Sequence, residues 1–590
     1  MAEDTRLSVK GLNYGGVGSQ PLGKLSKIPF SNWKKATDKF NEHQQCEYHK
    51  RLEDPDENDG NFRALLRYKA MGGDETLKHH LENSSKNARY LSPTIQNEVI
   101  NVCNKLIVQK IVAKITSVKL FSVLADETSD IAGMEQFSLC VRYYDNDIKK
   151  IREDFLQCVG VTDLTGKGLA NVLMDTLANL HIDGNFMIGQ GYDGAAAMSG
   201  RLHGAQQYVA EKFDLAIYVH CASHSLNLAL SDACELPAVR NCMGILNSTY
   251  TFFNTPKRQS LLANSIEKLT PKASASRLKR LCATRWIERH ESVNVFIQLQ
   301  KATVDALEIM SSWHDTTTSS TAVQLLGAIR SLEFQVSLRV ISKIFAITLP
   351  VSRILQTENF DLSAALKFTE DSSSLLVNMR KVAESEFTTV FNEVKDICED
   401  FDIDILIPRR AGKQIQRCNV MANTPEEYYR IAVFIPFLDS VICQIGDRLL
   451  KHKSVLRGFM CLLPNDSGFT KEQEKNAIIL MQKYERLINS SVIDESIGEL
   501  KLWWRHIITS GNVPQNAHQA FLMCDVKIFP TVHKLLQICV TLPVTTAVSE
   551  RSFSTLRRLK TYLRNTTCED RLNGMALLNI HRQIEILADG

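Results

Sequence analysis

The sequence predicts an α/β core joined to a large all-α region. Between residues 118 and 235, short apolar runs that end in acids or turns are followed by segments of helical periodicity. From residue 236 to about 530, apolar residues recur at helical spacing and strand signals are few. At 590 residues the chain is too long for one ordinary core, so we expect roughly two to four packed units.

The composition is that of an ordinary soluble protein, with 44% hydrophobic and 23% charged residues. The 69 basic and 66 acidic side chains nearly cancel, so any DNA contact must come from local patches. The 15 cysteines are scattered without a Cys-x-x-Cys pair, which indicates reduced thiols. The N-terminus lacks a signal peptide, and no apolar run approaches the roughly 20 residues that span a bilayer. We therefore expect an intracellular protein without a membrane partner.

The N-terminal part divides into two predicted regions. Residues 1–60 have loop and linker composition, interrupted by one short helical candidate at 30–52. Residues 61–117 are expected to form a helical region. Within it, residues 75–118 show helical spacing of the apolar residues Ile95, Val99, Val102 and Leu106.

The core segment, residues 118–235, predicts three consecutive strands and then alternating helices and strands. The strand candidates are 119–130, 137–150, 151–161, 185–193 and 215–224, and the helix candidates are 162–182, 194–213 and 225–234. This order is that of the ribonuclease H core, whereas a generic doubly wound sheet alternates from its start. The segment therefore predicts the first part of a ribonuclease-H-like core.

The remainder predicts an all-helical insertion domain at 236–530 and a C-terminal segment at 531–590. The long periodic stretches 292–310 and 321–349 are too extensive to be loops. Pro543 breaks the chain near the start of the last segment. Thr545 or Thr546 can then cap a helix that carries Glu550.

Two acids follow strands that should be neighbours. Asp126 ends the first strand and Asp193 follows the fourth, and in a core of this order the first and fourth strands lie side by side. Two adjacent carboxylates repel each other, and bound Mg²⁺ or Mn²⁺ removes that repulsion. A two-metal site can activate an attacking oxygen and stabilise the leaving oxygen of a phosphodiester. Glu127 should point to the opposite face and is the weaker ligand candidate. The alternative is that both aspartates are ordinary turn residues.

Five stretches, in order, resemble the hAT superfamily of DNA transposases and the host proteins derived from them. They are LADETSD, GQGYDGAAAMSG, VHCASHSLNLAL, ATRWIERH and LPVTTAVSERSFSTLRRLKTYLRNTTCEDRLNGMALLNI. The resemblance extends from about residue 30 to the C-terminus. Each motif is weak alone, but five in the right order are specific. The chain looks most like the host-gene-like branch that includes zinc finger MYM-type and repressor-of-the-inhibitor-of-the-protein-kinase-like proteins.

The resemblance implies a catalytic and metal-binding triad of Asp126, Asp193 and Glu550, served by Mg²⁺ or Mn²⁺. It also implies a ribonuclease-H-like core that is split by the helical insertion, with residues 531–590 completing it. This last segment resembles the hAT C-terminal dimerisation region, so a homodimer or higher oligomer is expected. The apolar positions expected to drive self-association are Leu556, Leu559, Leu563, Leu572 and Leu577.

Further positions match motifs near the active site and the DNA. Cys221 and His224 match a Cys-x-x-His motif near the active site, although a packed cysteine and a helix-start histidine are the simpler interpretation. Trp286 matches a tryptophan that stacks on a flipped base, and Arg285 could hold a nearby phosphate. Without the resemblance, Trp286 would be assigned to the core.

A basic cluster follows Glu550 and contains no acid between residues 551 and 564. It either lines DNA or forms a solvated helix face. Its members are Arg551, Arg557, Arg558, Lys560 and Arg564.

The N-terminal segment departs from the family. Residues 30–52 resemble only the tail of a TTF-type zinc finger, in which His43 and His49 match the two histidine ligands. The first cysteine of the chain is Cys46, so the upstream cysteine ligands are absent and a four-ligand zinc site cannot form. Residues 1–60 are therefore interpreted as a finger remnant and linker, and zinc is not expected.

Two functional hypotheses remain open. The first is a nuclear, DNA-binding, dimerising protein that, if active, cleaves and transfers DNA strands with Mg²⁺. The second is a domesticated, non-catalytic protein with an interaction or transcription-regulatory role. The intact triad favours the first and the missing finger cysteines favour the second. The balance leans slightly toward a non-mobile host or relic protein that keeps the fold.

Overall fold

The computed structural model describes residues 61–85, 88–282, 286–357, 361–408, 420–450, 458–465, 468–488, 493–561, 564 and 566–586. The predicted zinc-finger remnant with His43, Cys46 and His49 lies outside these residues, as do Arg285 and Leu563. The chain divides into two compact units, Met1–Val102 and Cys103–Gly590. Each unit is described by itself.

The described part of the first unit is helical and consists of α5 (Asn61–Met71), α6 (Glu75–Asn83) and the beginning of α7 (Pro93–Val118). The carboxylate of Asp74 caps α6 by accepting the backbone N–H of Leu77 at 2.9 Å. The helical span expected at 75–118 is thus two helices, and the second begins at a proline, which suits a first turn but not a helix interior.

The buried face of α7 differs from the predicted one. Val99 and Val102 are exposed, and the buried residues lie in the second half of the helix, within the second unit. They are Ile107, Ile111, Ile115 and Val118. This spacing places them on one helical stripe, which packs into the core that also contains side chains of the sheet.

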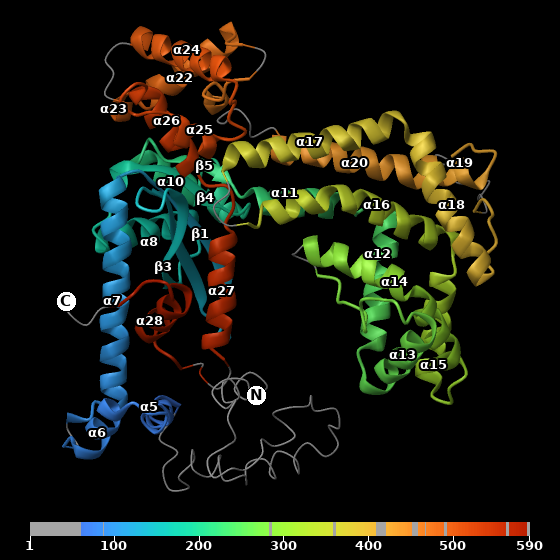
Figure 1. Cartoon of the computed structure of the whole chain (residues 1–590). Helices are drawn as coiled ribbons and strands as arrows, with labels where there is room; N and C mark the ends of the chain where they lie inside the picture. Colours follow the sequence, from blue (N-terminus) through green and yellow to red (C-terminus); the bar gives the residue numbers. More distant parts are fainter. Residues whose placement is uncertain are drawn as a thin grey trace. The chain divides into compact units, whose positions relative to one another are not determined.

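The second unit is built around one mixed five-stranded sheet in the order β3-β2-β1-β4-β5 (Figure 1). Its strands are β1 (Phe121–Ser129), β2 (Glu135–Asp145), β3 (Lys150–Val161), β4 (Met187–Tyr192) and β5 (Ile217–His220). The first three strands pair antiparallel, and β4 and β5 run parallel to β1. The prediction that the first and fourth strands are neighbours is confirmed.

Helices that are distant in sequence build one core against the sheet. This core contains apolar side chains of α7, α8 (Gly166–Asn179), α10 (Ala205–Lys212), α27 (Ala547–Leu559) and α28 (Glu569–Ile580). In Figure 1 the red C-terminal helices α27 and α28 lie beside the sheet strands, and both contact it directly. The C-terminal segment is therefore an integral part of the sheet core.

This arrangement buries, within one chain, leucines that were expected to drive self-association. Leu556 is 6% exposed, Leu572 2% and Leu577 0%, and all three belong to the core around the sheet. Leu559 is partly buried against the same core. Because these side chains are already packed within one chain, they cannot supply the main contact between two chains.

Beyond the sheet segment, the described elements are helical until the C-terminus. They are α11 (Ala222–Ala233), α12 (Pro237–Phe253), α13 (Pro256–Leu269), α14 (Trp286–Ser311), α15 (Thr316–Ile329), α16 (Leu332–Ile354), α17 (Leu362–Lys381), α18 (Ala383–Phe401), α19 (Pro425–Tyr429), η4 (Arg430–Phe434), α20 (Ile435–Ile445), η5 (Gly446–Leu450), α22 (Lys471–Lys483), α23 (Glu485–Ile488), α24 (Ile493–Ser510), α25 (Ala517–Met523) and α26 (Pro530–Thr541). They share a second core, which also takes Tyr144, Ile188 and Ile217 from the sheet.

Two predicted helices are each divided in the structure. The span 194–213 consists of the short α9 (Ala196–Ser199) and α10, separated by a turn from Gly200 to Gly204. The span 321–349 is divided near Arg330, where Ser331 caps α16 by accepting the N–H of Phe334 at 3.3 Å. Apolar periodicity continues across both breaks, which is why it did not reveal them.

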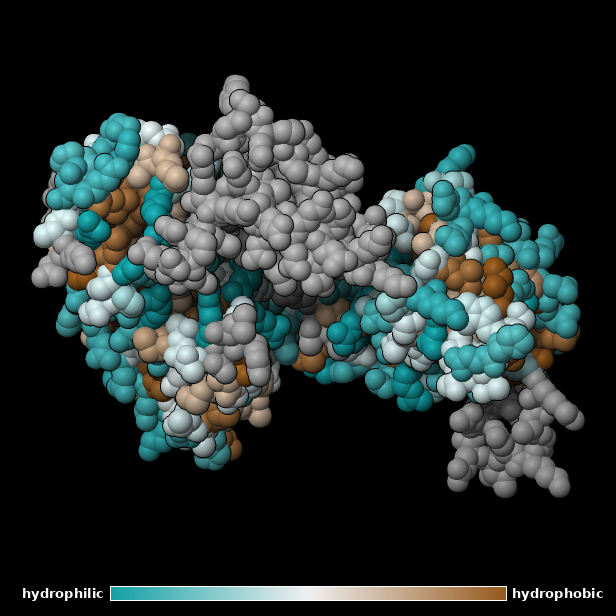
Figure 2. All heavy atoms as spheres, turned by 90° about the horizontal axis from the view of Figure 1, so that it is seen from below, coloured by the Kyte–Doolittle hydropathy of each residue, from teal (hydrophilic) through white to brown (hydrophobic). Residues whose placement is uncertain are grey.

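Two described segments, α16 and Pro425–Leu449, are long and apolar enough to cross a membrane by length and composition alone. In α16, 67% of the apolar window is buried, and the helix carries Arg339, which donates to the amide oxygens of Gln335 and Gln300. The buried share of the second segment is 39%. Core helices of soluble proteins pass the same test, so these segments are weak evidence for a membrane span. On the face seen in Figure 2, hydrophilic residues predominate and hydrophobic patches are scattered.

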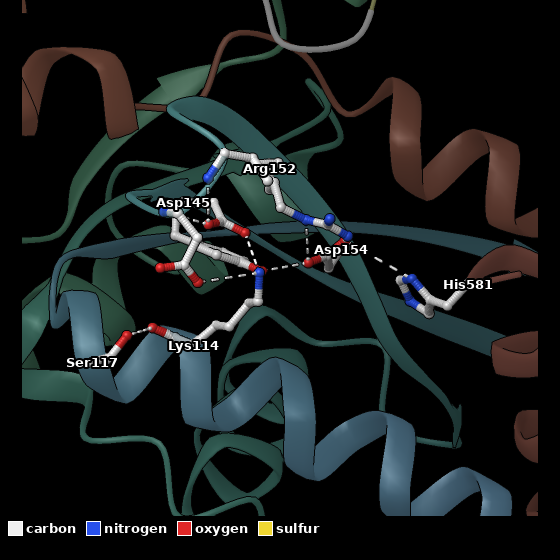
Figure 3. A network of polar contacts seen from close by, with 9 residues as sticks. Lys114, Ser117, Asp145, Arg152, Asp154 and His581 are labelled. Carbon is white, nitrogen blue, oxygen red and sulfur yellow. Dashed lines mark hydrogen bonds and ion pairs between the residues drawn. The ribbon is translucent and has the colours of Figure 1, made fainter. Parts of the chain in front are cut away.

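A network of polar contacts connects α7 and His581, near the C-terminus, to the neighbouring strands β2 and β3 (Figure 3). Lys114 of α7 pairs with Asp145 at the end of β2. On β3, Arg152 pairs with Asp154 at 2.7 Å. The ring of His581 contacts the carbonyl oxygen of Phe155 at 2.8 Å and lies 3.9 Å from Asp154.

Candidate active site

Asp126 lies within β1, which continues to Ser129 and does not end at Asp126 as expected, and its position is partly buried. Its carboxylate accepts the backbone N–H of Glu127 at 3.0 Å. Burial raises the pKa of Asp126 to about 8, with further increases from the negative charges of Asp193 and Glu550. The structure therefore brings the three predicted acids into electrostatic contact, although they come from widely separated segments.

Asp193 reaches this site because β4 runs parallel to β1. The register pairs Leu124 with Gly191, and each aspartate lies two residues beyond this last pair, Asp126 on β1 and Asp193 directly after β4. The carboxylate of Asp193 accepts the N–H of Ala195 at 3.0 Å, as in an Asx turn. The hydroxyl of Tyr218 on β5 donates to the carbonyl oxygen of Asp193 at 3.2 Å. The backbone position of Asp193 is thus fixed from both sides.

Two glycines of β4 allow the C-terminal segment to lie directly on the sheet. A Cβ at Gly189 would stand 2.6 Å from Cδ of Pro543, and one at Gly191 would stand 2.7 Å from Cβ of the same proline. Contacts this short are sterically forbidden, so these positions require glycine. The glycine pattern before Asp193 therefore serves the docking of Pro543, which precedes α27.

Helix α27 places Glu550 in its first turn, as predicted. The N-cap position is Thr546, but its side chain makes no capping bond, and the neighbouring Thr545 hydroxyl accepts the N–H of Ala547 at 3.2 Å. Small polar side chains of α27 lie against β2, where the hydroxyl of Ser552 meets that of Ser138 at 2.8 Å. These contacts fix the position of α27, and with it Glu550, along β1 and β2.

The far end of α27 is also tied to the sheet. Lys560, the C-cap residue, pairs with Asp130 just after β1, and both side chains are about nine-tenths buried. This pair lowers the pKa of Asp130, against the raising effect of its burial. Lys560 therefore holds the helix in place. It does not belong to an exposed DNA-binding face.

Cys221 connects the segments that carry Asp193 and Glu550. Its backbone N–H donates to the carbonyl oxygen of Tyr192 at the end of β4, at 3.0 Å. Its Sγ accepts the N–H of His224 at 3.4 Å, capping α11, and both the N–H at 3.3 Å and the hydroxyl at 3.4 Å of Thr546. Burial raises the pKa of the thiol to about 11, so the side chain is a neutral thiol.

His224 lies one turn into α11, next to a second histidine that the sequence analysis did not single out. The ring centroids of His220 and His224 are 6.0 Å apart, and the Nδ1 atom of His220 meets the Ser225 hydroxyl at 2.6 Å. A Cβ at Gly194 would stand 2.7 Å from Nε2 of His220, so this ring packs against the residue that follows Asp193. His220 belongs to the motif VHCASH, but only the folded structure shows that it lies next to His224 and Gly194.

Glu127 was expected to point away from the site, but its carboxylate interacts electrostatically with Asp193. Burial and then the charge of Asp193 raise its pKa. Its Oε2 atom is buried and has no hydrogen-bond partner among the described residues. A buried carboxylate oxygen without a donor is unfavourable, so Glu127 adds to the uncompensated negative charge at this end of the sheet.

The donor set fits a divalent cation. Carboxylate oxygens are the ligands preferred by Mg²⁺ and Mn²⁺, and a cation would offset the mutual repulsion that raises the pKa of Asp126. Among the described residues, no group of three or more His, Cys, Asp or Glu side chains converges closely enough to hold a metal ion. Two of the acids, Asp126 and Asp193, direct an oxygen to backbone N–H groups instead.

The predicted DNA-contacting residues are placed only in part. Arg285 lies outside the described residues, and Trp286 is the first residue of α14, with a side chain that is not described. Arg551, Arg557 and Arg558 are exposed on α27, the helix that carries Glu550. Arg551 donates to the carbonyl oxygen of Gln356 at 3.3 Å. Three exposed residues of the basic cluster thus lie on the helix of the third acid, and the exposed Arg564 lies beyond its end.

The fold and this acidic site define an RNase-like α/β protein with a hAT-type C-terminal segment. Residues 46–204 match the family described as ZMYM1/FAM200, RNase-like domain, and residues 520–584 match the hAT family C-terminal dimerisation region. The first match contains Asp126 and Asp193, and the second contains Glu550. The chain is therefore hAT-related and transposon-derived, which confirms the resemblance inferred from its motifs.

Particular relatives extend this relationship over most of the chain. The chain is homologous to the "52 kDa repressor of the inhibitor of the protein kinase" of Homo sapiens and to the protein of the same name from Mus musculus. Each is 25% identical over 544 residues, which cover 89% of this chain and 70% of the relative.

Proposed function

We propose that the second unit contains a ribonuclease-H-like core whose acidic site acts on DNA phosphodiester bonds. The observation that carries this proposal is the electrostatic interaction of Asp126 with both Asp193 and Glu550, which come from distant segments of the chain. Three antiparallel strands followed by two parallel ones, with β1 central and beside β4, agree with such a core. The hAT relationship supports DNA as the substrate class.

Asp126, Asp193 and Glu550 would hold the divalent cations, with Glu127 as a fourth carboxylate nearby. Bound cations would lower the energy of the attacking and leaving oxygens of the phosphodiester. The chain's own contribution is positioning. The Cys221 thiol holds Thr546 against α11, and Glu550 is hydrogen-bonded to Thr546 through the backbone at 3.1 Å. Exposed Arg551, Arg557 and Arg558 on the same helix would bind the phosphate backbone next to the acids.

Cleavage and strand transfer on labelled duplex DNA with Mg²⁺ or Mn²⁺ tests this proposal. Wild-type protein should produce nicked or joined products, and Glu550→Gln and Asp193→Asn should lose them while keeping DNA binding. Asp175→Asn, on the exposed face of α8, is the matched control and should behave as wild type. Products that persist in both triad variants would refute the assignment of the site.

A regulatory role without catalysis is the second candidate. It is favoured by the homology to a protein named as a repressor, and a nuclear location would accompany either role. The same experiment separates the two, because a purely regulatory protein binds DNA or partner proteins and gives no cleavage products with either cation.

Self-association belongs to both candidates and is proposed to use an exposed apolar surface at the start of the hAT dimerisation match. Leu522 is 52% exposed, Val526 53% and Ile528 60%, and all three lie within residues 520–584. The leucines further along are buried within the chain's own core. An exposed apolar cluster in a segment of this kind is a suitable contact for a second copy of the chain.

A further inference from the structure

A cationic segment connects α13 to α14 in the helical part of the second unit. Residues 268–287 contain six Lys or Arg residues and no Asp or Glu, in a chain whose charges otherwise nearly cancel. We call its described irregular part, residues 270–282, the cationic loop. Lys272, Arg277, Lys279 and Arg280 of this loop are all exposed. It is a local positive patch of the kind that a nearly neutral chain needs for binding a polyanion.

The cationic loop is held in place on the helices beneath it. Leu278 is 7% exposed and lines a small hollow together with side chains of α12 and α14. The carbonyl oxygen of Arg280 accepts the Ser292 hydroxyl at 2.7 Å, and that of Cys282 accepts Nε of Arg289 at 2.7 Å. Because α14 anchors the loop backbone, less conformational entropy is lost when its side chains bind a ligand.

The charges of the loop are largely uncompensated. Lys279 pairs with Glu291 at 2.6 Å, but both side chains are about half exposed, so the pair is weak. The side chains of Lys272, Arg277 and Arg280 form no ion pair within the part of the chain that the structure describes. An anchored loop with three free cationic side chains can contact several phosphates at once.

The neighbouring basic residues of α13 are different, because they are used for packing. Nζ of Lys257 lies 4.3 Å from the centre of the Trp313 ring, and the Arg258 guanidinium lies 4.3 Å from that of Phe252. Arg258 also donates to the Thr318 hydroxyl at 2.9 Å. The outward positive charge is therefore a property of the loop itself.

We propose that the cationic loop binds the phosphate backbone of duplex DNA. Lys and Arg side chains neutralise phosphates and release counterions, which gives sequence-independent affinity. The proposal rests on DNA as the substrate class of the proposed function, but it requires neither cation binding nor cleavage. It assigns DNA binding to a surface outside the acidic site and outside α27.

The test measures binding of the full-length chain to a short fluorescent duplex by anisotropy over a series of salt concentrations, with EDTA present. The variant K272E/R277E/R280E should lower affinity at low salt about tenfold or more, and reduce the slope of log K against log salt by about 2 to 3. Arg277→Gln and Arg280→Gln alone should each reduce the slope by about 1. Thermal melting of each variant checks that the fold is kept.

The matched control is K367E/K381E/K471E, which changes the net charge equally at exposed lysines of α17 and α22. It should keep nearly the wild-type slope. An equal loss in the control, unchanged binding in the loop variant, or no DNA binding by the wild type would each overturn the proposal.

Failure of the nuclease proposal has a different signature. Binding that depends on the cationic loop, without cleavage by the wild type, would refute the catalytic role and leave the loop assignment intact. Cleavage by the wild type, together with wild-type DNA binding by the loop variant, would support the catalytic role and refute the loop assignment.

Discussion

At the scale of single residues, Cys221 shows how a motif of modest specificity becomes essential through its contacts. Its sulfur accepts three hydrogen bonds and links the start of α11 to Thr546, the N-cap residue of the Glu550 helix, while its backbone N–H donates to Tyr192 at the end of β4. From the sequence, a packed cysteine is the simpler interpretation. The partner Thr546 lies more than three hundred residues away, so spacing alone could not reveal it.

Replacing Cys221 with valine should destabilise the chain by about 1 to 3 kcal/mol, because buried donors of Thr546 and His224 lose their acceptor. Denaturant unfolding measures this difference. Cys234→Val is the matched control, because Cys234 is also buried but its side chain makes no hydrogen bond of this kind among the described residues. Equal losses in both variants would mean that packing alone explains the role of Cys221.

Replacing Asp126 with asparagine should stabilise the chain, in contrast to the replacement of Cys221 with valine. Burial raises the pKa of Asp126 to about 8, so near neutral pH in EDTA the folded chain must take up a proton there that the unfolded chain does not bind. Asp126→Asn removes this cost and should raise the free energy of unfolding by on the order of 1 to 3 kcal/mol. Thermal melting should also show that Mn²⁺ stabilises the wild type and has little effect on this variant. Asp175→Asn should respond to Mn²⁺ like the wild type. Equal Mn²⁺ shifts in all three proteins would contradict a cation site at the acids.

At the scale of elements, the β1–β4 pair and the segment before α27 form one packed layer. The sequence predicted the strands, their order and the neighbouring positions of Asp126 and Asp193. The structure shows that Pro543 occupies the space above Gly189 and Gly191, a contact between segments that no local pattern encodes.

Gly191→Ala should therefore destabilise the chain by about 1 to 3 kcal/mol, since its Cβ would stand 2.7 Å from Pro543 and 2.9 Å from Leu124. Gly244→Ala in α12 is the control, because a Cβ there meets nothing within 4 Å. A helix interior favours alanine, so the control should be neutral or stabilised by up to about 1 kcal/mol. Equal unfolding curves for Gly191→Ala and the wild type would show that Pro543 can move away without cost.

The leucines of the C-terminal helices α27 and α28 are a second case in which the sequence pattern was ambiguous. Their leucines have the spacing of an interaction face, and the sequence could not show whether the partner surface is another chain or the same one. In the structure the sheet of the same chain covers them. Removal of everything after residue 535 would thus expose the core, so point substitutions are the better test of self-association.

The variant L522E/V526E/I528E should shift the mass from oligomer to monomer in light scattering, because charged side chains oppose an apolar contact between copies. The control L202E/L375E/V382E changes exposed apolar residues outside the hAT dimerisation match and should keep the wild-type mass. An oligomer that persists in the first variant would place the interface elsewhere.

At the scale of the whole molecule, buried histidines predict how stability depends on pH. Burial lowers the pKa of His290, His533 and His581 below the ordinary value of 6.5. The unfolded chain then binds more protons than the folded one below about pH 6.5, so stability falls as the pH decreases through this window. The raised pKa of Asp126 has the opposite effect in the same window, because the folded chain holds that proton more tightly than the unfolded chain does. The test therefore uses Asp126→Asn, whose free energy of unfolding should decrease between about pH 7 and 5 by on the order of 1 to 3 kcal/mol.

His581→Asn should weaken this pH dependence, since His581 is the histidine in contact with Phe155 and Asp154 at the sheet. Both changes are made in Asp126→Asn, and His79→Asn is the control, because it changes an exposed histidine on α6 and should leave the pH dependence of that variant unchanged. A profile of Asp126→Asn that is flat across the same window would contradict the role assigned to the buried histidines.

The large-scale organisation was more predictable than its boundaries. Long stretches of helical periodicity and the change to strand patterns indicated an α/β core and a helical region, which the structure shows. The breaks at Gly200–Gly204 and near Arg330 were missed, because a helix can stop without interrupting its apolar pattern. The cationic loop was also missed, since its anchoring by Leu278 and Ser292 is a tertiary property.

The dependence of the sheet on residues 531–586 has a consequence for biosynthesis. The five strands emerge from the ribosome within the first 220 residues, but the helices that cover β1, β2 and β3 follow about three hundred residues later. During that interval the sheet has an uncovered apolar face, which makes it prone to aggregation and dependent on chaperones. A premature stop codon anywhere before α27 should therefore yield a product that is degraded, whatever the length of the helical region already made.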